Sequence, residues 1–263
     1  MIVSLYIGQY SGIYMSKINI LLTQEHIEKS IHDDALDMWI KNAYQNISEI
    51  IEKNDFPCLF GKHAWKLKSV FFVFLSKKSY INEILSALTE LTHRVKTVSK
   101  EERIYTPLLC VFEDTNFHSI EKEQDFSWRI LQEIHNNDIM EWPHHIPKDP
   151  DNSQWSFCFN GVELFINISC PNHNHVRSRN LGDNIVFVIN PRVHFDIVAS
   201  MNDPKGLKVR QTIRERSKKY NNGLEPISLG FYGDDDNREW KQYALHEPGT
   251  TVAHECPLRI RGK

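Results

Sequence analysis

The chain lacks the short motifs that mark the commonest enzyme classes. It has no glycine-rich phosphate loop after an expected strand, no G-x-S-x-G nucleophile elbow, no H-E-x-x-H zinc motif and no paired carboxylate motif. These absences argue against kinases, Rossmann dehydrogenases and the common hydrolases.

The chain also lacks paired cysteines and a charge of one dominant sign. Its five cysteines are odd in number, widely spaced and never arranged as C-x-x-C, which argues against a disulfide framework or a zinc ribbon and fits a reducing cytosol. The net charge of −3 gives no overall attraction to nucleic acid or to an anionic membrane, so we expect neither as a partner.

The first 22 residues contain no basic start, no small-residue cleavage site and no unbroken apolar run. We therefore expect neither a signal peptide nor a membrane span, and a cytoplasmic location. The composition, at 41% hydrophobic and 25% charged residues, is that of an ordinary globular protein. The length of 263 residues is enough for one large or two small domains.

Apolar periodicity predicts alternating helices and strands. The spacing predicts helices over residues 33–53, 81–95 and 119–135, and two more between 193 and 220, interrupted near 203–206. Runs that are apolar on both faces predict buried strands over 70–75, 107–112 and 185–189. Two β-rich runs flanking Asn160-Gly161 predict a hairpin with a type I′ turn over 155–168. Proline and glycine predict loops over 55–61 and 142–150.

These elements predict a single α+β domain, with a mixed, mainly antiparallel sheet and packed helices, over residues 33–240. Residues 1–32 are expected to be an N-terminal extension and lead-in, with the first fourteen residues dangling. Residues 241–263 show little periodicity and are expected to form a C-terminal tail.

The clearest chemical signal lies in residues 169–180, between the hairpin and the next strand. Two histidines and two arginines, His173, His175, Arg177 and Arg179, fall within seven residues. Histidine is the commonest metal ligand, and arginine binds carboxylates through its planar fork of donors. The pattern suits an anionic cofactor that contains a metal, and haem fits, because one imidazole can bind the iron while arginines pair with the propionates. The alternative is that these side chains are solvated or cap backbone carbonyls.

Other candidate groups have simpler interpretations. A Cys58 thiolate would indicate a site like that of cytochrome P450, but its apolar neighbours raise the pKa of a thiol and favour a packed core cysteine. His144 and His145 are adjacent in a proline-rich loop, where their side chains diverge. Arg214 and Arg216 belong to a basic stretch that is expected to be a solvated helix face, although one of them could face a cofactor or substrate carboxylate.

Several segments together resemble the YqcI/YcgG family, in the same order along roughly residues 35 to 240. The segments are Phe56-Pro57-Cys58-Leu59-Phe60-Gly61, the hairpin 155–168, Pro171-Asn172-His173, Arg177-Ser178-Arg179-Asn180, Asn190-Pro191-Arg192, and Ile213-Arg214-Glu215-Arg216 with Tyr220. The resemblance implies a haem-dependent oxygenase of a natural-product pathway that N-hydroxylates the guanidine or amine of an arginine-like amino acid.

The resemblance also implies site residues. It places the axial ligand of a haem b iron at His173, with His175 as the second choice, and makes Arg177, Arg179 and Arg192 candidates for pairing with the propionates. N-hydroxylation consumes dioxygen and electrons, and the chain has no flavin or nicotinamide motif, so a separate reductase is implied. A charged amino-acid substrate would need an acidic wall at one end and donors at the other.

Two other functions are consistent with the same residues. One is a non-catalytic haem-binding sensor or carrier of the same fold, and the other is an interaction protein without a cofactor. A Soret band separates the haem proteins from the last, and turnover separates the oxygenase from the sensor.

Overall fold

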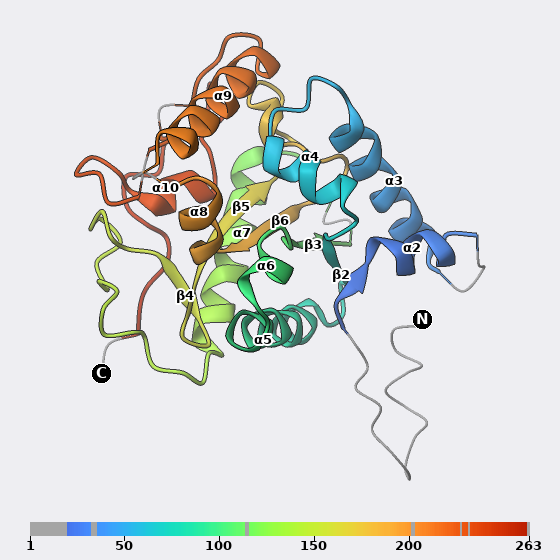
Figure 1. The fold of residues 1–263 in the computed structure, drawn as a ribbon, viewed down its shortest axis with the longest axis horizontal. Helices are drawn as coiled ribbons and strands as arrows, with labels where there is room; N and C mark the ends of the chain where they lie inside the picture. The colour runs from blue at the N-terminus through green and yellow to red at the C-terminus, as the bar shows by residue number, and fades with distance from the viewer. Residues whose placement is uncertain are drawn as a thin grey trace.

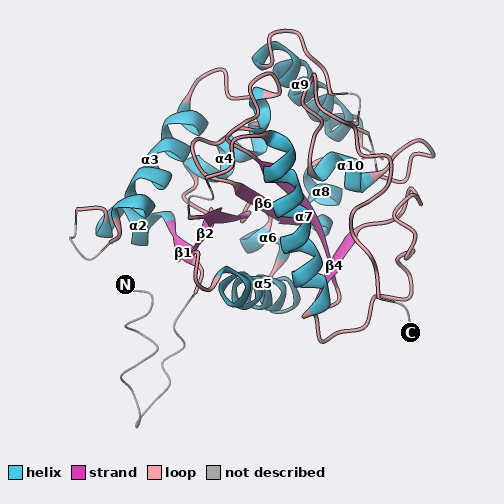
Figure 2. Cartoon of the chain, turned by 180° about the vertical axis from the view of Figure 1, so that it is seen from behind, coloured by secondary structure: helices cyan, strands magenta, loops and turns pink. Residues whose placement is uncertain are grey.

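A computed structural model describes residues 20–32, 36–113, 116–200, 203–226, 228–230 and 232–261. Within these residues the chain forms a mixed sheet of six strands in the order β1-β2-β3-β6-β5-β4, with helices packed on both faces (Figures 1 and 2). This arrangement confirms the expected α+β class. The strands are β1 Leu22–Thr23, β2 Phe71–Leu75, β3 Leu108–Phe112, β4 Phe157–Phe159, β5 Val162–Ser169 and β6 Val186–Pro191. The α-helices are α2 Gln24–Ser30, α3 Met38–Glu52, α4 Leu59–Lys66, α5 Tyr80–Thr97, α6 Lys100–Arg103, α7 Ile120–Asn136, α8 Arg192–Val198, α9 Pro204–Tyr220 and α10 Glu239–Tyr243.

The centre of the sheet has both faces covered. Strands β2 and β3 are parallel, and the other neighbouring strands are antiparallel. Because successive side chains of a strand point to opposite faces, Phe72 and Phe74 pack with α2, α3 and α4, while Val73 and Leu75 pack with α5 and α7. This explains why the strand is apolar at every position.

The predicted hairpin is confirmed. β4 pairs with β5 in antiparallel register, and Phe159 lies opposite Val162. Asn160 and Gly161 have φ of 51° and 70°, the left-handed backbone that both central residues of a type I′ turn require. The turn fixes where β5 begins, and the histidine-rich loop follows the other end of this strand.

The region predicted as a loop over residues 55–61 differs from the structure. Helix α4 begins at Leu59, because Cys58 acts as its N-cap and its Sγ accepts a hydrogen bond from the backbone N–H of Gly61 at 3.2 Å. Pro57 precedes the helix, where its missing N–H costs nothing. The helix predicted to start at residue 33 begins at Met38, and residues 33–35 lie outside the described part of the chain.

The two ends of the described chain contribute to the core. Leu21 and Ile27 are buried, and β1 pairs with β2, so residues 20–32 are part of the packed domain. The first fourteen residues lie outside the described residues. At the other end, where a tail was expected, Tyr243, Leu245 and Leu258 are buried. The segment 241–261 therefore packs against the sheet and its helices.

No helix in the described ranges is both long enough and apolar enough to cross a bilayer.

Candidate functional site

The loop that joins β5 to β6 holds most of the residues singled out from the sequence. Its ends are tied together, since Cys170 N–H donates to the carbonyl of Arg179 at 2.9 Å. A single 3-10 turn, Arg177–Arg179, closes the loop, with Arg179 N–H donating to the carbonyl of Val176 at 2.8 Å. The loop is therefore a fixed backbone structure at the end of a rigid strand, as expected of a binding loop.

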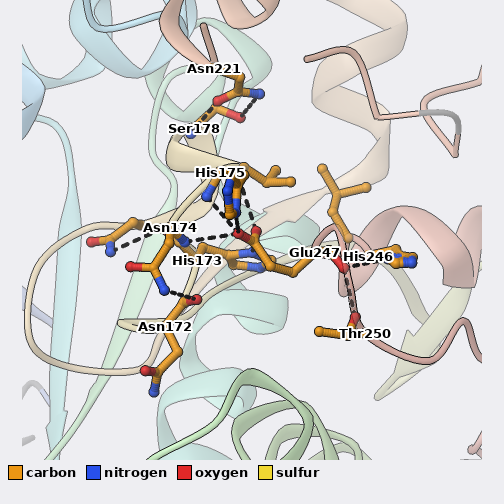
Figure 3. A network of polar contacts seen from close by, with 12 residues as sticks. Asn172, His173, Asn174, His175, Ser178, Asn221, His246, Glu247 and Thr250 are labelled. Atoms are coloured by element: carbon orange, nitrogen blue, oxygen red, sulfur yellow. Dashed lines mark hydrogen bonds and ion pairs between the residues drawn. The ribbon is translucent and has the colours of Figure 1, made fainter.

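The side chain of His173 is buried inside this loop and is held by a carboxylate from a distant part of the chain. Its residue is only 1% exposed, and Nδ1 lies 3.0 Å from Oε2 of Glu247 (Figure 3). The other ring nitrogen, Nε2, is buried without a hydrogen-bond partner in the described residues. Burial lowers the pKa of His173, so the ring is neutral near pH 7, with one nitrogen paired and the other available.

Glu247 organises the whole loop around its carboxylate. The carboxylate accepts backbone N–H groups from three successive residues, Asn174, His175 and Val176, in addition to the contact with His173. Burial by itself would raise the pKa of Glu247, but these hydrogen bonds from His173 and the backbone lower it to about 2. The carboxylate therefore stays ionised and accepts a hydrogen bond from the Nδ1–H group of His173.

His175 shares the carboxylate but not the buried position. Its Nδ1 lies 2.8 Å from Oε1 of Glu247, and its side chain is 67% exposed. Both histidines thus meet one acid, and only His173 presents a buried, unpartnered nitrogen. The structure favours His173 over His175 as a ligand for a buried metal centre.

Arg179 is a buried cation without a carboxylate partner among the described residues. It is 6% exposed; Nη2 donates to the carbonyl of Gln242 at 2.9 Å, and Nη1 has no partner. Burial lowers the pKa of Arg179 to about 10. A buried charge is costly unless it is paired, so an anionic group beside Arg179 would stabilise the site.

Arg177 and Arg192 lie in different surroundings. The Arg177 guanidinium stacks over the ring of Tyr220 at 4.8 Å and is exposed. Arg192 forms a buried ion pair with Glu239 and lies 3.2 Å from the ring centroid of Tyr232. Thus Arg177 and Arg179 share the loop of His173, whereas Arg192 belongs to a buried cluster in which it already has a carboxylate partner.

Two of the segments that carry the resemblance to the family, around Phe56 and around Arg216 and Tyr220, contact each other, and Tyr220 contacts Arg177 of the loop. Arg216 donates from Nη2 to the carbonyls of Asn54 and Phe56, and the Phe56 ring packs edge-on against Tyr220. Arg216 therefore joins α9 to the backbone before α4, a structural role. Cys58 is partly buried, and burial raises the pKa of its thiol, so it is a neutral helix cap and a poor candidate for a thiolate ligand.

A family model described as the YqcI/YcgG family matches residues 47–259. The chain belongs to this family. It is 37% identical over 246 residues to a Streptomyces lavendulae protein named "Putative N(omega)-hydroxy-L-arginine synthase DcsA", covering 92% of this chain and 90% of that one. It is 30% identical to YcgG and to YqcI of Bacillus subtilis, covering 92% and 86% of this chain and 95% and 89% of theirs. No solved structure matches.

Sequence reasoning missed two acids that complete the site. Glu247 lies within the part of the chain that matches the YqcI/YcgG model, yet no periodic or motif signal marks it. Glu123, on α7, accepts the backbone N–H of Asn172 at 3.1 Å and its side-chain amide at 2.6 Å. The one local signal near Glu247 is Pro248-Gly249, which indicates a turn but not its carboxylate contact.

Taken together, the site offers one buried imidazole nitrogen with a free lone pair, one buried guanidinium N–H without an acceptor, and an ionised carboxylate behind the imidazole. A histidine nitrogen can hold the iron of a haem, and arginine can pair with the two anionic propionates that a haem carries. The residues present therefore suit a haem.

Proposed function

We propose that this protein is a haem-dependent oxygenase that adds one oxygen atom to a guanidine or amine nitrogen of an arginine-like amino acid. The observation that carries the proposal is the buried Nε2 of His173, which has no partner while Nδ1 is held by Glu247. The choice of substrate is supported by the similarity to the Streptomyces lavendulae protein named "Putative N(omega)-hydroxy-L-arginine synthase DcsA".

His173 would hold the iron through Nε2, and Glu247 would fix the tautomer. An ionised acceptor on Nδ1 keeps the proton on that nitrogen, which leaves the lone pair of Nε2 free for a metal. Such carboxylate partners also orient the ring and make the imidazole a stronger donor. The three backbone N–H donors on Glu247 hold the acceptor itself in place.

Arg179 would pair with a propionate. Its Nη1 lacks an acceptor and its charge is buried. An anion at this position would offset the desolvation penalty of the buried guanidinium. Arg177 is exposed next to the same turn and is a second candidate. Arg192 remains a weaker candidate because Glu239 occupies its guanidinium.

The bound haem would supply the activation of dioxygen. The overall reaction joins one oxygen atom to the substrate nitrogen and releases the other as water, consuming two electrons and two protons. The electrons would come from a separate reductase, since the chain carries no nicotinamide or flavin motif. The residues of this chain bind the cofactor, keep the imidazole neutral and exclude water from Nε2.

The test has two steps on the purified full-length protein. Hemin titration should give a saturable Soret band with about one haem per chain, as expected of a single axial histidine. Arginine supplied with reductant and dioxygen should then gain the mass of one oxygen atom. Absence of a saturable Soret change would refute the haem proposal. Binding of hemin with no product from arginine, lysine or simple guanidines would favour the sensor or carrier function instead.

A further inference from the structure

A cavity of about 600 Å³ lies beside the His173 loop. Val176 and His246 line it, and each adjoins the network around Glu247: Val176 donates its backbone N–H to Glu247 at 3.0 Å, and His246 is the residue before Glu247. Cavities of roughly 300–1,000 Å³ are the usual size of small-molecule sites. The cavity therefore has the size of a small-molecule site and adjoins the carboxylate that holds His173.

One buried polar group in the cavity wall lacks a partner. Asn237 lines the cavity and is 4% exposed. Its Oδ1 accepts a hydrogen bond from Nε2 of Gln242 at 2.6 Å, while Nδ2 is buried with no partner in the described residues. Leaving an amide N–H buried and unpaired is unfavourable, so a ligand acceptor that reaches Nδ2 would be favoured.

The Asn237 side chain is held in this orientation by its surroundings. A Cβ at Gly230 would lie 2.4 Å from Oδ1 of Asn237, so only glycine leaves room for the amide. The side chain of Gln242 donates to Oδ1 of Asn237, and the backbone carbonyl of Gln242 accepts a hydrogen bond from Nη2 of Arg179. The unpaired N–H is therefore positioned by the same residues that position the candidate haem site.

The charges around the cavity favour a cation. Asp234, Asp236 and Glu225 line it together with Lys241 and Arg238. Glu225 is paired with Lys218, and Nε of Arg238 lies 3.9 Å from Oδ1 of Asp151, whereas neither Asp234 nor Asp236 has an ion-pair partner among the described residues. Two carboxylates thus remain for a ligand cation, against the one ammonium of Lys241, which lies 5.3 Å from the ring centroid of Trp240.

We propose that this cavity binds the substrate as a cationic amino acid, with its α-carboxylate on Nδ2 of Asn237 and its cationic side chain against Asp234 and Asp236. The inference rests on the proposed function for the identity of the substrate. It adds the residues that select the two charged ends of that substrate.

The test compares L-arginine with agmatine, which has the same guanidine but no carboxylate, by calorimetric titration into the full-length protein. Wild type should bind arginine more tightly than agmatine. Asn237→Asp keeps the shape of the side chain but replaces the N–H donor by an acceptor. This variant should lower the affinity for arginine by about tenfold or more, the ratio that corresponds to ~1.4 kcal/mol. Its affinity for agmatine should be unchanged or higher.

Two further variants keep the test decisive. Gly230→Ala changes no charge but displaces the Asn237 amide, so it should also erase the preference for arginine. Replacing Asp234 and Asp236 together by Asn should lower the affinity for both ligands. Asp235 lies between them but does not line the cavity, so Asp235→Asn should change neither affinity.

Equal binding of arginine and agmatine by wild type would overturn the inference, and so would equal effects of Asn237→Asp on the two ligands. An effect of Asp235→Asn as large as that of the double variant would overturn the role of the acids. These binding results are independent of turnover. Carboxylate-selective binding without hemin binding would refute the haem proposal alone, and product formation without dependence on Asn237 would refute this inference alone.

Discussion

Nδ1 of His173 lies 3.0 Å from the carboxylate of Glu247, although 74 positions separate the two residues in the chain. The same carboxylate accepts three successive backbone N–H groups of the loop that carries His173. One side chain therefore fixes both the orientation of the ring and the path of the backbone around it. This relationship makes the site sensitive to single substitutions in separate ways.

The first prediction concerns the ligand histidine. His173→Ala should abolish or greatly weaken the Soret band of the hemin complex, because it removes the buried nitrogen that has no other partner. His175→Ala should leave the band nearly unchanged, because the exposed ring of His175 shares only the carboxylate. Absorbance titration with hemin measures both. If His175→Ala lost the Soret band and His173→Ala kept it, His175 would be the ligand and His173 would not.

The second prediction concerns Glu247. Glu247→Gln should weaken hemin binding by roughly 10–100-fold, the usual effect of removing the hydrogen-bond partner of a metal-bound histidine. The Soret position should shift as well, since the imidazole becomes a weaker donor. Glu123→Gln is the matched control: it alters a buried carboxylate that binds Asn172 in the same loop but does not touch His173. Equal loss in both variants would indicate a purely structural role for Glu247.

The third prediction contrasts two buried arginines. Arg179→Met should leave the free energy of unfolding of the hemin-free protein unchanged or higher, because the native cation has no carboxylate partner, while hemin affinity falls. Arg192→Met should lower the free energy of unfolding by about 3–5 kcal/mol at pH 8, because it leaves Glu239 buried without its cation. Denaturant unfolding and hemin titration measure the two effects. Arg179→Met with unchanged hemin affinity would contradict the propionate role.

The fourth prediction concerns pH. Burial raises the pKa of Glu239 to about 7, against the opposing effect of Arg192. Because the folded value lies above the unfolded value, folding favours the protonated carboxyl; the associated stability is present below pH 4.5 and is lost as pH rises through about 7. Glu239→Gln mimics the protonated form. The free energy of unfolding of wild type relative to this variant should therefore fall from about pH 5 to about pH 8, an interval that spans most of the range between the unfolded and folded pKa values of Glu239. A constant difference over that range would show that Glu239 keeps one protonation state.

The elements that the sequence predicted correctly are those with a local cause. The alternation of Phe72 with Val73 and of Phe74 with Leu75 reflects two covered faces, and the Asn160-Gly161 turn requires a backbone that those two residues adopt readily. The position of His173 in a loop at the end of a strand also follows from local signals. Helix α4 was missed because its start depends on a cysteine cap, a role more often filled by Ser, Thr, Asp or Asn.

The partners of the site residues could not be predicted, because they are contacts between irregular segments far apart in the chain. Glu247 and Asn237 lie in a stretch without helical or strand periodicity, so no pattern indicated that they are buried. Likewise, the pairing of Arg192 with Glu239 depends on how α10 packs against β5. Sequence patterns reflect the neighbours of a residue along the chain, whereas these contacts depend on three-dimensional packing.

The late position of Glu247 has a consequence for synthesis of the protein. At roughly 5–20 residues per second, the ribosome adds Glu247 about 4–15 seconds after His173. During that interval the loop has three adjacent backbone N–H groups and an imidazole whose common acceptor does not yet exist. A nascent chain therefore cannot complete the contacts that hold His173 until the segment with Glu247 has been made and has packed against the sheet.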